Sequence, residues 1–383
     1  MSEMHSDAFW MQKALSLAAK AEGEVAPNPM VGSVLVHQNT VVSEGYHKGP
    51  GTWHAERSAL MNYEEAVHQD AVLYVNLEPC CSWGRTPPCT DIILEKGVKK
   101  VVVGMIDPDP RMAGQGIKRL RDAGVDVVVG VEEKACRELN RAYLRARSDR
   151  RPWIVLKAAS SLDGRIATHF GESKWITGTQ ARKHVHSQRG KIDGILVGGR
   201  TLRIDDPSLT TRYNNGRDAI PIILSASCQI PKTANILTAG EKPILLGSEQ
   251  LFKGWYDSSK EDSWLDVLDT DLLEFYNVPL VPDGDLIDLS RALEHLVDCG
   301  IYSLMVEGGG GVHRSFLVEG LVDEFWLYLS GKVLGAGTGW VAEHPWHLSE
   351  APQFSILEHL VLKEDMFIRY RNISVDIMKL GKN

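Results

Sequence analysis

The chain has 383 residues, of which 43% are hydrophobic and 24% are charged, close to the average of globular proteins, so a disordered protein is excluded. Its formal net charge is −8, which argues against a protein that coats nucleic acid or that binds a membrane through a polybasic surface. At about 150 residues per domain, this length indicates two or three domains.

Neither a membrane-spanning nor a secreted protein is indicated. No apolar run approaches the ~20 residues of a spanning helix, and the N-terminus lacks a basic segment followed by an apolar one, so we expect a cytoplasmic protein.

Six cysteines are too few for a disulfide scaffold. Three of them form a cluster that indicates a metal site or catalysis: Cys80, Cys81 and Cys89. The others are expected to be small buried apolar residues: Cys136, Cys228 and Cys299.

Alternating helix and strand patterns cover the first 147 residues. Asp7 is the predicted N-cap of the first helix, because apolar residues follow it at helical spacing. The predicted strands are 31–36, 40–43, 71–77, 100–105 and 125–129. The further predicted helices are 54–60, 89–95, 116–122 and 132–147. Strands that alternate with helices predict a layered α/β sheet.

An arginine-rich segment follows and ends at Pro152; its arginines are Arg141, Arg145, Arg147, Arg150 and Arg151. It is either an anion-binding patch or, as we favour, a solvated helix end followed by a linker. We therefore expect a first domain at 1–147, a linker at 148–151 and a second domain at 152–383.

The second half has another α/β pattern. The predicted strands are 153–159, 195–197, 221–224, 243–246, 304–306, 325–329 and 366–371, and the predicted helices are 180–188, 289–297 and 312–318. Four consecutive glycines, 308–311, separate a strand from a helix. They form either a cradle for a phosphate group at the helix N-terminus or simply a permissive turn.

The strongest chemical signal is the set His54, Glu56, Cys80 and Cys89. Catalytic zinc has three protein ligands and one open position, and one imidazole with two thiolates lets the ion bind and acidify a water molecule. Cys89 begins a predicted helix, whose dipole favours a thiolate. Glu56 lies two positions after His54, so the pair must lie at the first turn, with Glu56 reaching over the metal without binding it.

This set matches the signature of zinc deaminases, H-x-E followed by P-C-x-x-C, except that eight residues separate the two cysteines. The alternative is a closed structural zinc site with Cys81 as fourth ligand. We favour the catalytic site, because adjacent residues rarely point to one centre. His47 and His68 are nearby alternative ligands.

The first 147 residues resemble the deaminase half of the bifunctional riboflavin-biosynthesis deaminase/reductase family. The matching segments are 27–32, 45–47, 54–56, 79–89 and 107–110. The resemblance implies a cytidine-deaminase-like mixed-sheet domain with one zinc ion per chain on His54, Cys80 and Cys89, and Glu56 as proton shuttle. It also implies that Asn28 and His47 hold the substrate and that Arg85 faces its phosphate. Members of this family often have Ser-His after the first cysteine ligand, where this chain has Cys81 and Ser82.

The second half is similar to the reductase half of the same family, which has a dihydrofolate-reductase-like α/β fold. The matching segments are 157–165, 171–177, 193–201, 205–212 and 304–311. The resemblance implies NADPH as cofactor, bound by Ala159, Trp175, Thr201, Asp205, Gly309, Gly310, Gly311, Val312, His313, Arg314 and Ser315. It places the substrate against Ser173, Arg189, Leu209, Arg212 and Glu307. Smaller residues are common in the family at Arg200 and Arg203, which either bind the cofactor phosphate or are solvated.

The resemblance as a whole implies a bifunctional enzyme of riboflavin biosynthesis. Its zinc-dependent half would deaminate a diaminopyrimidinone ribosyl phosphate, and its NADPH-dependent half would reduce the ribosyl side chain to ribityl. Lys157, Asp205 and Glu307 are candidates for polar roles around the reduced carbon. We expect a small-molecule substrate, no nucleic acid, no membrane and a homo-oligomer. The alternatives are a nucleoside or tRNA-base deaminase, which the second half argues against, and a non-catalytic binding protein, which the intact metal set argues against.

Overall fold

The protein divides into two compact units in its computed structural model, which describes residues 5–84, 86–212, 217–259, 263–282 and 284–381. The first unit is Met1–Arg150 together with Asp376–Asn383, and the second is Arg151–Val375. The predicted boundaries differ from this division at the C-terminus, which was expected in the second domain. Buried Arg137 donates hydrogen bonds to the backbone carbonyls of Ile377 and Leu380, and these bonds hold the last residues in the first unit. Within the described ranges, no helix is long and apolar enough to cross a membrane.

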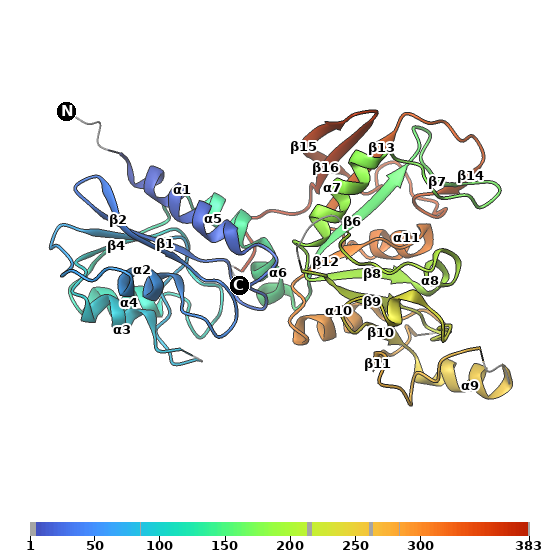
Figure 1. Cartoon of the computed structure of the whole chain (residues 1–383), viewed down its shortest axis with the longest axis horizontal. Coiled ribbons are helices and arrows are strands. Elements are labelled where there is room, and N and C mark those ends of the chain that lie inside the picture. Colours follow the sequence, from blue (N-terminus) through green and yellow to red (C-terminus); the bar gives the residue numbers. More distant parts are fainter. Residues whose placement is uncertain (1–4, 85, 213–216, 260–262, 283, 382–383) are drawn as a thin grey trace. The chain divides into compact units, whose positions relative to one another are not determined.

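The first unit is built on a five-stranded mixed sheet in the order β2-β1-β3-β4-β5. Its strands are β1 (Gly32–His37), β2 (Thr40–Tyr46), β3 (Val72–Val75), β4 (Lys100–Val103) and β5 (Asp126–Val129). Strand β1 is antiparallel to β2 and β3, whereas β3, β4 and β5 are parallel. Its helices are α1 (Asp7–Ala18), η1 (Ala19–Ala21), α2 (Ala55–Met61), α3 (Cys89–Glu95), α4 (Gln115–Asp122), α5 (Glu133–Leu139) and α6 (Arg141–Asp149). Helices α1 and α5 cover one face of the sheet, and α2, α3 and α4 cover the other (Figure 1).

The start of the first helix and the continuity of the last predicted helix in the first unit differ from the prediction. The N-cap of α1 is Ser6 instead of Asp7, because the Ser6 side chain accepts a hydrogen bond from the Phe9 amide. The predicted helix 132–147 is two helices, α5 and α6, which meet at Asn140. The Asn140 side chain bonds both the amide and the carbonyl of Met30, at 2.8 and 3.0 Å, and this long-range contact holds the break.

The arginine-rich segment is only in part the solvated helix end and linker that we predicted. Arg145 is only 8% exposed and pairs with Asp149, while Arg141 pairs with Glu138. These side chains belong to α6, which extends two residues beyond the predicted helix end. The segment therefore begins as a packed helix, whereas Arg147 and Arg150 are exposed and Arg151, beyond the helix, pairs with Asp323 at 2.7 Å.

Glycine at position 45 lets α2 lie close to β2. A Cβ atom on Gly45 would lie 2.5 Å from the amide nitrogen of Ala59 and 2.7 Å from the carbonyl oxygen of Ala55. Ser43 on the same strand donates a hydrogen bond to the Ala59 carbonyl at 2.6 Å. These contacts fix the position of α2 and therefore of its N-terminal residues, which include His54 and Glu56.

The second unit contains a nine-stranded sheet in the order β11-β10-β9-β8-β12-β6-β13-β16-β15. Its strands are β6 (Trp153–Ser160), β8 (Gly194–Gly198), β9 (Ile220–Leu224), β10 (Ile244–Gly247), β11 (Glu274–Asn277), β12 (Ser303–Val306), β13 (Glu324–Ser330), β15 (Phe354–Leu362) and β16 (Asp365–Asn372). All neighbours are parallel except the β13–β16 and β16–β15 pairs. A separate ribbon pairs β7 (Arg165–Thr168) with β14 (Gly337–Gly339).

The helices of the second unit are α7 (Thr179–Arg189), α8 (Gly199–Asp205), η2 (Asn235–Leu237), α9 (Glu249–Ser259), α10 (Leu289–Asp298) and α11 (Gly310–Val318). Its core packs side chains of α10 and α11, including Leu293, Leu296 and Phe316, against buried strand residues such as Leu156 and Leu304. All seven strands predicted in this half belong to the large sheet, but β11 and β15 were not predicted. Strand β15 lacks the alternating burial of a half-buried strand, since seven consecutive residues are exposed.

The scattered cysteines divide into two groups. Cys136 and Cys228 are fully buried, as predicted, whereas Cys299 is exposed, so that prediction is wrong. Cys299 is the C-cap of α10, where the chain leaves the helix at the surface.

Candidate active sites

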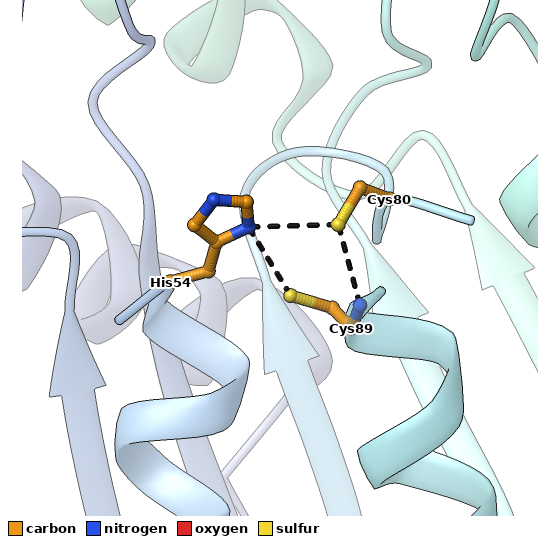
Figure 2. A group of neighbouring side chains, drawn as sticks. All are labelled: His54, Cys80 and Cys89. Atoms are coloured by element: carbon orange, nitrogen blue, oxygen red, sulfur yellow. Dashed lines mark hydrogen bonds between the residues drawn. The ribbon is translucent and has the colours of Figure 1, made fainter. Parts of the chain in front are cut away.

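Three predicted metal ligands of the first unit converge from separate elements. His54 is the N-cap of α2, Cys80 lies in the loop after β3, and Cys89 is the first residue of α3. His54 Nδ1 lies 3.5 Å from Cys80 Sγ and 3.4 Å from Cys89 Sγ (Figure 2). All three donor atoms lie within 4.8 Å of one another. Residues 35 positions apart in sequence thus form one compact donor set.

The chemistry of this donor set fits zinc, which prefers thiolate and imidazole ligands. The hydrogen bond with Cys89, together with His54, lowers the pKa of the Cys80 thiol to about 4. The hydrogen bond with Cys80 and burial raise the pKa of Cys89. On the far side of the imidazole, His54 Nε2 shares a 3.3 Å hydrogen bond with Thr86 Oγ1, which orients the ring. Sequence analysis did not single out Thr86.

Glu56 lies beside the donor set without belonging to it. It is 3% exposed, stands in the first turn of α2, and its carboxyl group hydrogen-bonds the Cys89 side chain. Burial, and next the negative charge of Cys80, raise the pKa of Glu56 to about 7. Cys81, the alternative fourth ligand, is outside the group of converging donors, and so are His47 and His68.

Asn28 and His47 adjoin this site. Asn28 Nδ2 lies 2.9 Å from His47 Nε2, and His47 Nδ1 lies 3.2 Å from the Trp53 carbonyl oxygen, an arrangement that fits a proton on Nδ1. The ring centroids of His47 and His54 are 5.3 Å apart, and burial lowers the pKa of His47. Both predicted substrate residues are therefore next to the donor set. Arg85, the third, is outside the described residues.

A buried carboxylate that sequence analysis missed anchors the loop of Cys80. Glu78 is 4% exposed and accepts hydrogen bonds from four backbone amides, at 2.8–3.2 Å. The donors are Asp107, Gly114, Gly116 and Ile117. Glu78 precedes Cys80 by two residues, so it ties the ligand loop to the segment that leads into α4. No local pattern marks it, because its partners are at least 29 residues away.

In the second unit, Lys157, Arg189 and Glu307 form a buried charge cluster. Arg189 Nε and Nη2 lie 2.8 and 2.9 Å from the two carboxylate oxygens of Glu307, and Arg189 Nη1 donates to the Thr210 carbonyl at 3.1 Å. Lys157 Nζ lies 3.5 Å from Glu307. Although burial acts in the opposite direction, Arg189 and Lys157 hold the pKa of Glu307 far below its usual range. The guanidinium that was predicted to face substrate is thus paired with a carboxylate.

Two other predicted substrate residues, Leu209 and Arg212, lie on the loop of Thr210, whose carbonyl Arg189 bonds. Arg212 is exposed, its guanidinium donates to Ser208 Oγ at 2.9 Å, and its amide donates to His186 Nδ1 at 3.3 Å. Burial and the charge of Arg189 lower the pKa of His186 to about 4. The remaining positions are Ser173, whose hydroxyl donates to Asp205 at 3.4 Å, and Leu209, which is buried.

The predicted cofactor loop opens α11 with glycines. The Gly309 amide donates to Thr201 Oγ1 at 3.2 Å, and no side chain among the described residues caps the helix N-terminus. A Cβ atom on Gly310 would lie 2.9 Å from the Ala342 amide and the Gly339 carbonyl, so only glycine fits. First-turn amides such as those of Gly311 and Val312 have no partner within the helix, which suits a phosphate group. The loop therefore fits the cofactor that the resemblance implies.

The other predicted cofactor residues differ in how far their side chains are exposed. The His313 ring is buried and bonds the Trp340 carbonyl at 2.6 Å, so its side chain faces the core. Trp175 is 58% exposed, with the Arg182 guanidinium 4.4 Å from its ring centre. Three further positions are Ala159 on β6 and Arg314 and Ser315 on α11.

Comparisons with known proteins agree with both halves. The RibD C-terminal domain family matches residues 152–367, and the cytidine and deoxycytidylate deaminase zinc-binding region matches residues 4–105. The riboflavin biosynthesis protein RibD of Aquifex aeolicus is 39% identical over 332 residues, which cover 86% of this chain and 88% of that protein. RibD of Actinobacillus pleuropneumoniae is 35% identical over 373 residues, which cover 96% of each.

Solved structures extend the similarity to the fold. The crystal structure of a diaminohydroxyphosphoribosylaminopyrimidine deaminase/5-amino-6-(5-phosphoribosylamino)uracil reductase from Thermotoga maritima has a TM-score of 0.83 at 32% identity, covering 96% of this chain and 98% of that one. Acinetobacter baumannii RibD also has a TM-score of 0.83 at 32% identity, covering 97% and 99%. The predicted fold class and the predicted pair of activities are thereby confirmed. The chain belongs to the RibD family of riboflavin biosynthesis, whose members join a zinc-dependent deaminase domain to an NADPH-dependent reductase domain.

Proposed function

We propose that the first unit hydrolyses an amino group of a diaminopyrimidinone ribosyl phosphate and that the second unit reduces the ribosyl chain of the product to ribityl. The observation that carries this proposal is the presence, in one chain, of the His54–Cys80–Cys89 donor set and of the glycine-opened helix α11. The Thermotoga maritima relative is named for these two activities and aligns over nearly the whole chain.

In the deaminase unit, we assign His54, Cys80 and Cys89 as the ligands that hold zinc. Bound there, Zn2+ would act as a Lewis acid that makes water a nucleophile at neutral pH. The Glu56 carboxylate, buried beside the ligands, would accept the proton of the attacking water and deliver it to the departing ammonia. Asn28 and His47 would hold the pyrimidine ring, because both present polar groups next to His54.

In the reductase unit, we assign the backbone amides of the α11 N-terminus and Thr201 to the cofactor phosphates. NADPH would supply the hydride for the sugar carbon. Glu307 stays ionised, since its pKa is held low, so it would accept a hydrogen bond from the sugar but not donate a proton. Lys157, the ammonium next to Glu307, is our candidate proton donor.

We assign the substrate phosphate of the reductase to Arg212, with Arg189 as a positioning residue. Arg212 is exposed and belongs to no ion pair with another described residue, whereas the Arg189 guanidinium group is paired with Glu307. The planar guanidinium group of arginine can donate two parallel hydrogen bonds to a phosphate dianion. The predicted contact of Arg189 with substrate thus becomes an indirect one.

We also propose a cytoplasmic homo-oligomer. All six cysteines are free thiols, which suits a reducing compartment. The edge strand β15 exposes Ile356, Leu357 and Val361 at 61%, 46% and 72%, and a long apolar edge of this kind is a template for pairing with another chain.

The test is coupled turnover with purified zinc-loaded protein. Ammonia release from the diaminopyrimidinone substrate should proceed without NADPH, and NADPH oxidation should follow only with the deaminated product. Cys89→Ala should abolish the first reaction alone, and Gly310→Val the second alone, with Cys81→Ser as matched control for the cysteine. Ammonia release from cytidine or deoxycytidylate but not from the diaminopyrimidinone would contradict the proposal and favour a nucleoside or nucleotide deaminase.

A further inference from the structure

A pocket of about 490 Å³ lies in the second unit, lined by residues other than the Lys157–Arg189–Glu307 cluster and the glycine loop. Helix α8, which follows β8, contributes Arg200 and Arg203, the segment after β9 contributes Ser225 and Ser227, and helix α9, which follows β10, contributes Trp255. The pocket thus lies at the carboxyl edge of three adjacent parallel strands, where ligands bind in open α/β sheets.

The two arginines give this pocket a positive charge that is not neutralised by ion pairs. Arg203 Nη1 donates to the Gln229 carbonyl at 3.3 Å, and within the described part of the chain neither Arg200 nor Arg203 has a carboxylate at ion-pair distance. Burial and the charge of Arg200 lower the pKa of Arg203, so the two guanidinium groups are close enough to repel each other. Asp285 is the one acidic residue among the pocket lining that the structure describes. A doubly charged anion would relieve this repulsion and accept hydrogen bonds from both guanidinium groups.

Helix α8 connects this pocket to the cofactor loop. Thr201 lies between the two arginines in sequence, and its hydroxyl accepts the hydrogen bond of the Gly309 amide. Strand β12, which leads to that loop, pairs with β8, and β8 pairs with β9. Because neighbouring strands are ~4.8 Å apart, a ligand that starts at the glycine loop reaches the arginines after one or two strand spacings.

We propose that Arg200 and Arg203 bind the phosphate on the adenosine ribose of NADPH in this pocket and so determine the preference of the second unit for NADPH over NADH. The inference rests on the proposed reductase function. NADPH and NADH differ only by this phosphate, so a residue that binds it changes the affinity of one nucleotide and not of the other. Ser225 and Ser227 supply hydroxyl groups beside the arginines, and Trp255 supplies an aromatic wall.

The experiment measures binding, without turnover, in the full chain. Dissociation constants for NADPH and NADH are determined from nucleotide fluorescence for the wild type, Arg200→Ala, Arg203→Ala and the double variant. Loss of charge-assisted hydrogen bonds should weaken NADPH binding by about 10–100-fold in the double variant, while NADH binding changes less than about twofold. The Arg200→Lys/Arg203→Lys variant should recover part of the lost NADPH affinity, because lysine keeps the positive charge but cannot donate two parallel hydrogen bonds.

Two controls separate this site from general charge effects. Arg291→Ala removes an exposed arginine on α10 that pairs with Glu294, and it should leave both dissociation constants unchanged. Higher ionic strength should weaken NADPH binding more than NADH binding in the wild type, and this difference should disappear in the double variant.

The outcomes are distinguishable. A double variant that keeps the wild-type ratio of the two dissociation constants overturns the inference, and so does an equal loss of affinity for both nucleotides, which would place the arginines on a group common to both. If the wild type binds neither nucleotide, the proposed reductase function itself fails. Competition by adenosine 2′-phosphate that is lost in the double variant supports the assignment, because this probe carries the phosphate without the nicotinamide.

Discussion

Replacing Arg189 with alanine would remove the main partner of the Glu307 carboxylate. In the wild type, two hydrogen bonds of 2.8 and 2.9 Å join the side chains, and of the charged partners that the structure describes only Lys157, at 3.5 Å, would remain. The side chains of Arg189 and Glu307 are 12% and 9% exposed, so solvent screens the pair little. Removing one partner of a buried ion pair costs about 3–5 kcal/mol. We therefore expect Arg189→Ala to lower the unfolding midpoint of the second unit by about 6–20 °C.

The loss of stability should depend on pH. In the wild type the folded pKa of Glu307 is depressed, so the pair stabilises the protein at every pH above the usual carboxyl range and is lost only as the pH falls toward that much lower value. In the variant, the carboxylate is buried with a weaker partner, so burial favours its protonated form, and the penalty is removed as the pH falls through the usual carboxyl range. The difference in stability between wild type and variant should therefore be largest at neutral pH and shrink as the solution is acidified.

Calorimetry and urea unfolding of the full chain would measure both effects. Ammonia release by the first unit serves as an internal control and should not change. A second control replaces both partners, as Arg189→Met with Glu307→Leu, and should recover much of the stability because no charge is left unpaired. A stable Arg189→Ala protein, with a loss below about 1 kcal/mol and a raised KM for the reductase substrate, would refute this reasoning and restore Arg189 as a direct ligand of the substrate phosphate.

Three further predictions concern the assigned site residues. Metal analysis should find zinc lost in Cys80→Ala and retained in Cys81→Ser, because only Cys80 belongs to the converging donors; loss confined to the Cys81 variant would contradict the ligand set. Glu56→Gln should keep zinc but slow ammonia release by about 10²–10⁴-fold, and near-normal release would exclude its role as proton carrier. Arg212→Ala should raise the KM for the reductase substrate by about 10–100-fold in steady-state kinetics, with lysine restoring only part of the affinity and an unchanged KM counting against the phosphate assignment.

The convergence of His54, Cys80 and Cys89 could be predicted from sequence because these residues lie close together in the chain. His54, Glu56, Cys80 and Cys89 lie within 36 positions, and the residue types alone indicate a metal. The residues that hold these side chains in place could not be predicted in this way. The described donors to Glu78 are all backbone amides, and any residue except proline can supply an amide, so no pattern of side chains indicates the contact.

The reductase site was predicted less completely, because its contacts are long-range. Arg189 and Glu307 are 118 positions apart, and each was assigned separately to the substrate. Only the fold brings β12 and the end of α7 together, and pairing of the two charges then changes what each can bind. Strand β15 was missed for a different physical reason, since an edge strand with both faces exposed has no alternation of apolar and polar residues.

The return of the C-terminal residues has a topological consequence: the second unit is an insertion within the first. The backbone leaves the first unit after Arg150 and re-enters it at Asp376, so residues 151–375 form one continuous excisable segment, whereas the deaminase unit is split. A chain cut after Arg150 would retain every assigned zinc ligand. It would nevertheless lack the carbonyl oxygens that the buried Arg137 guanidinium bonds, at a cost of about 1–3 kcal/mol for unsatisfied polar groups. An independent deaminase would therefore need residues 376–383 joined to its end through a short linker. The reductase unit is one continuous segment and could be replaced as a whole.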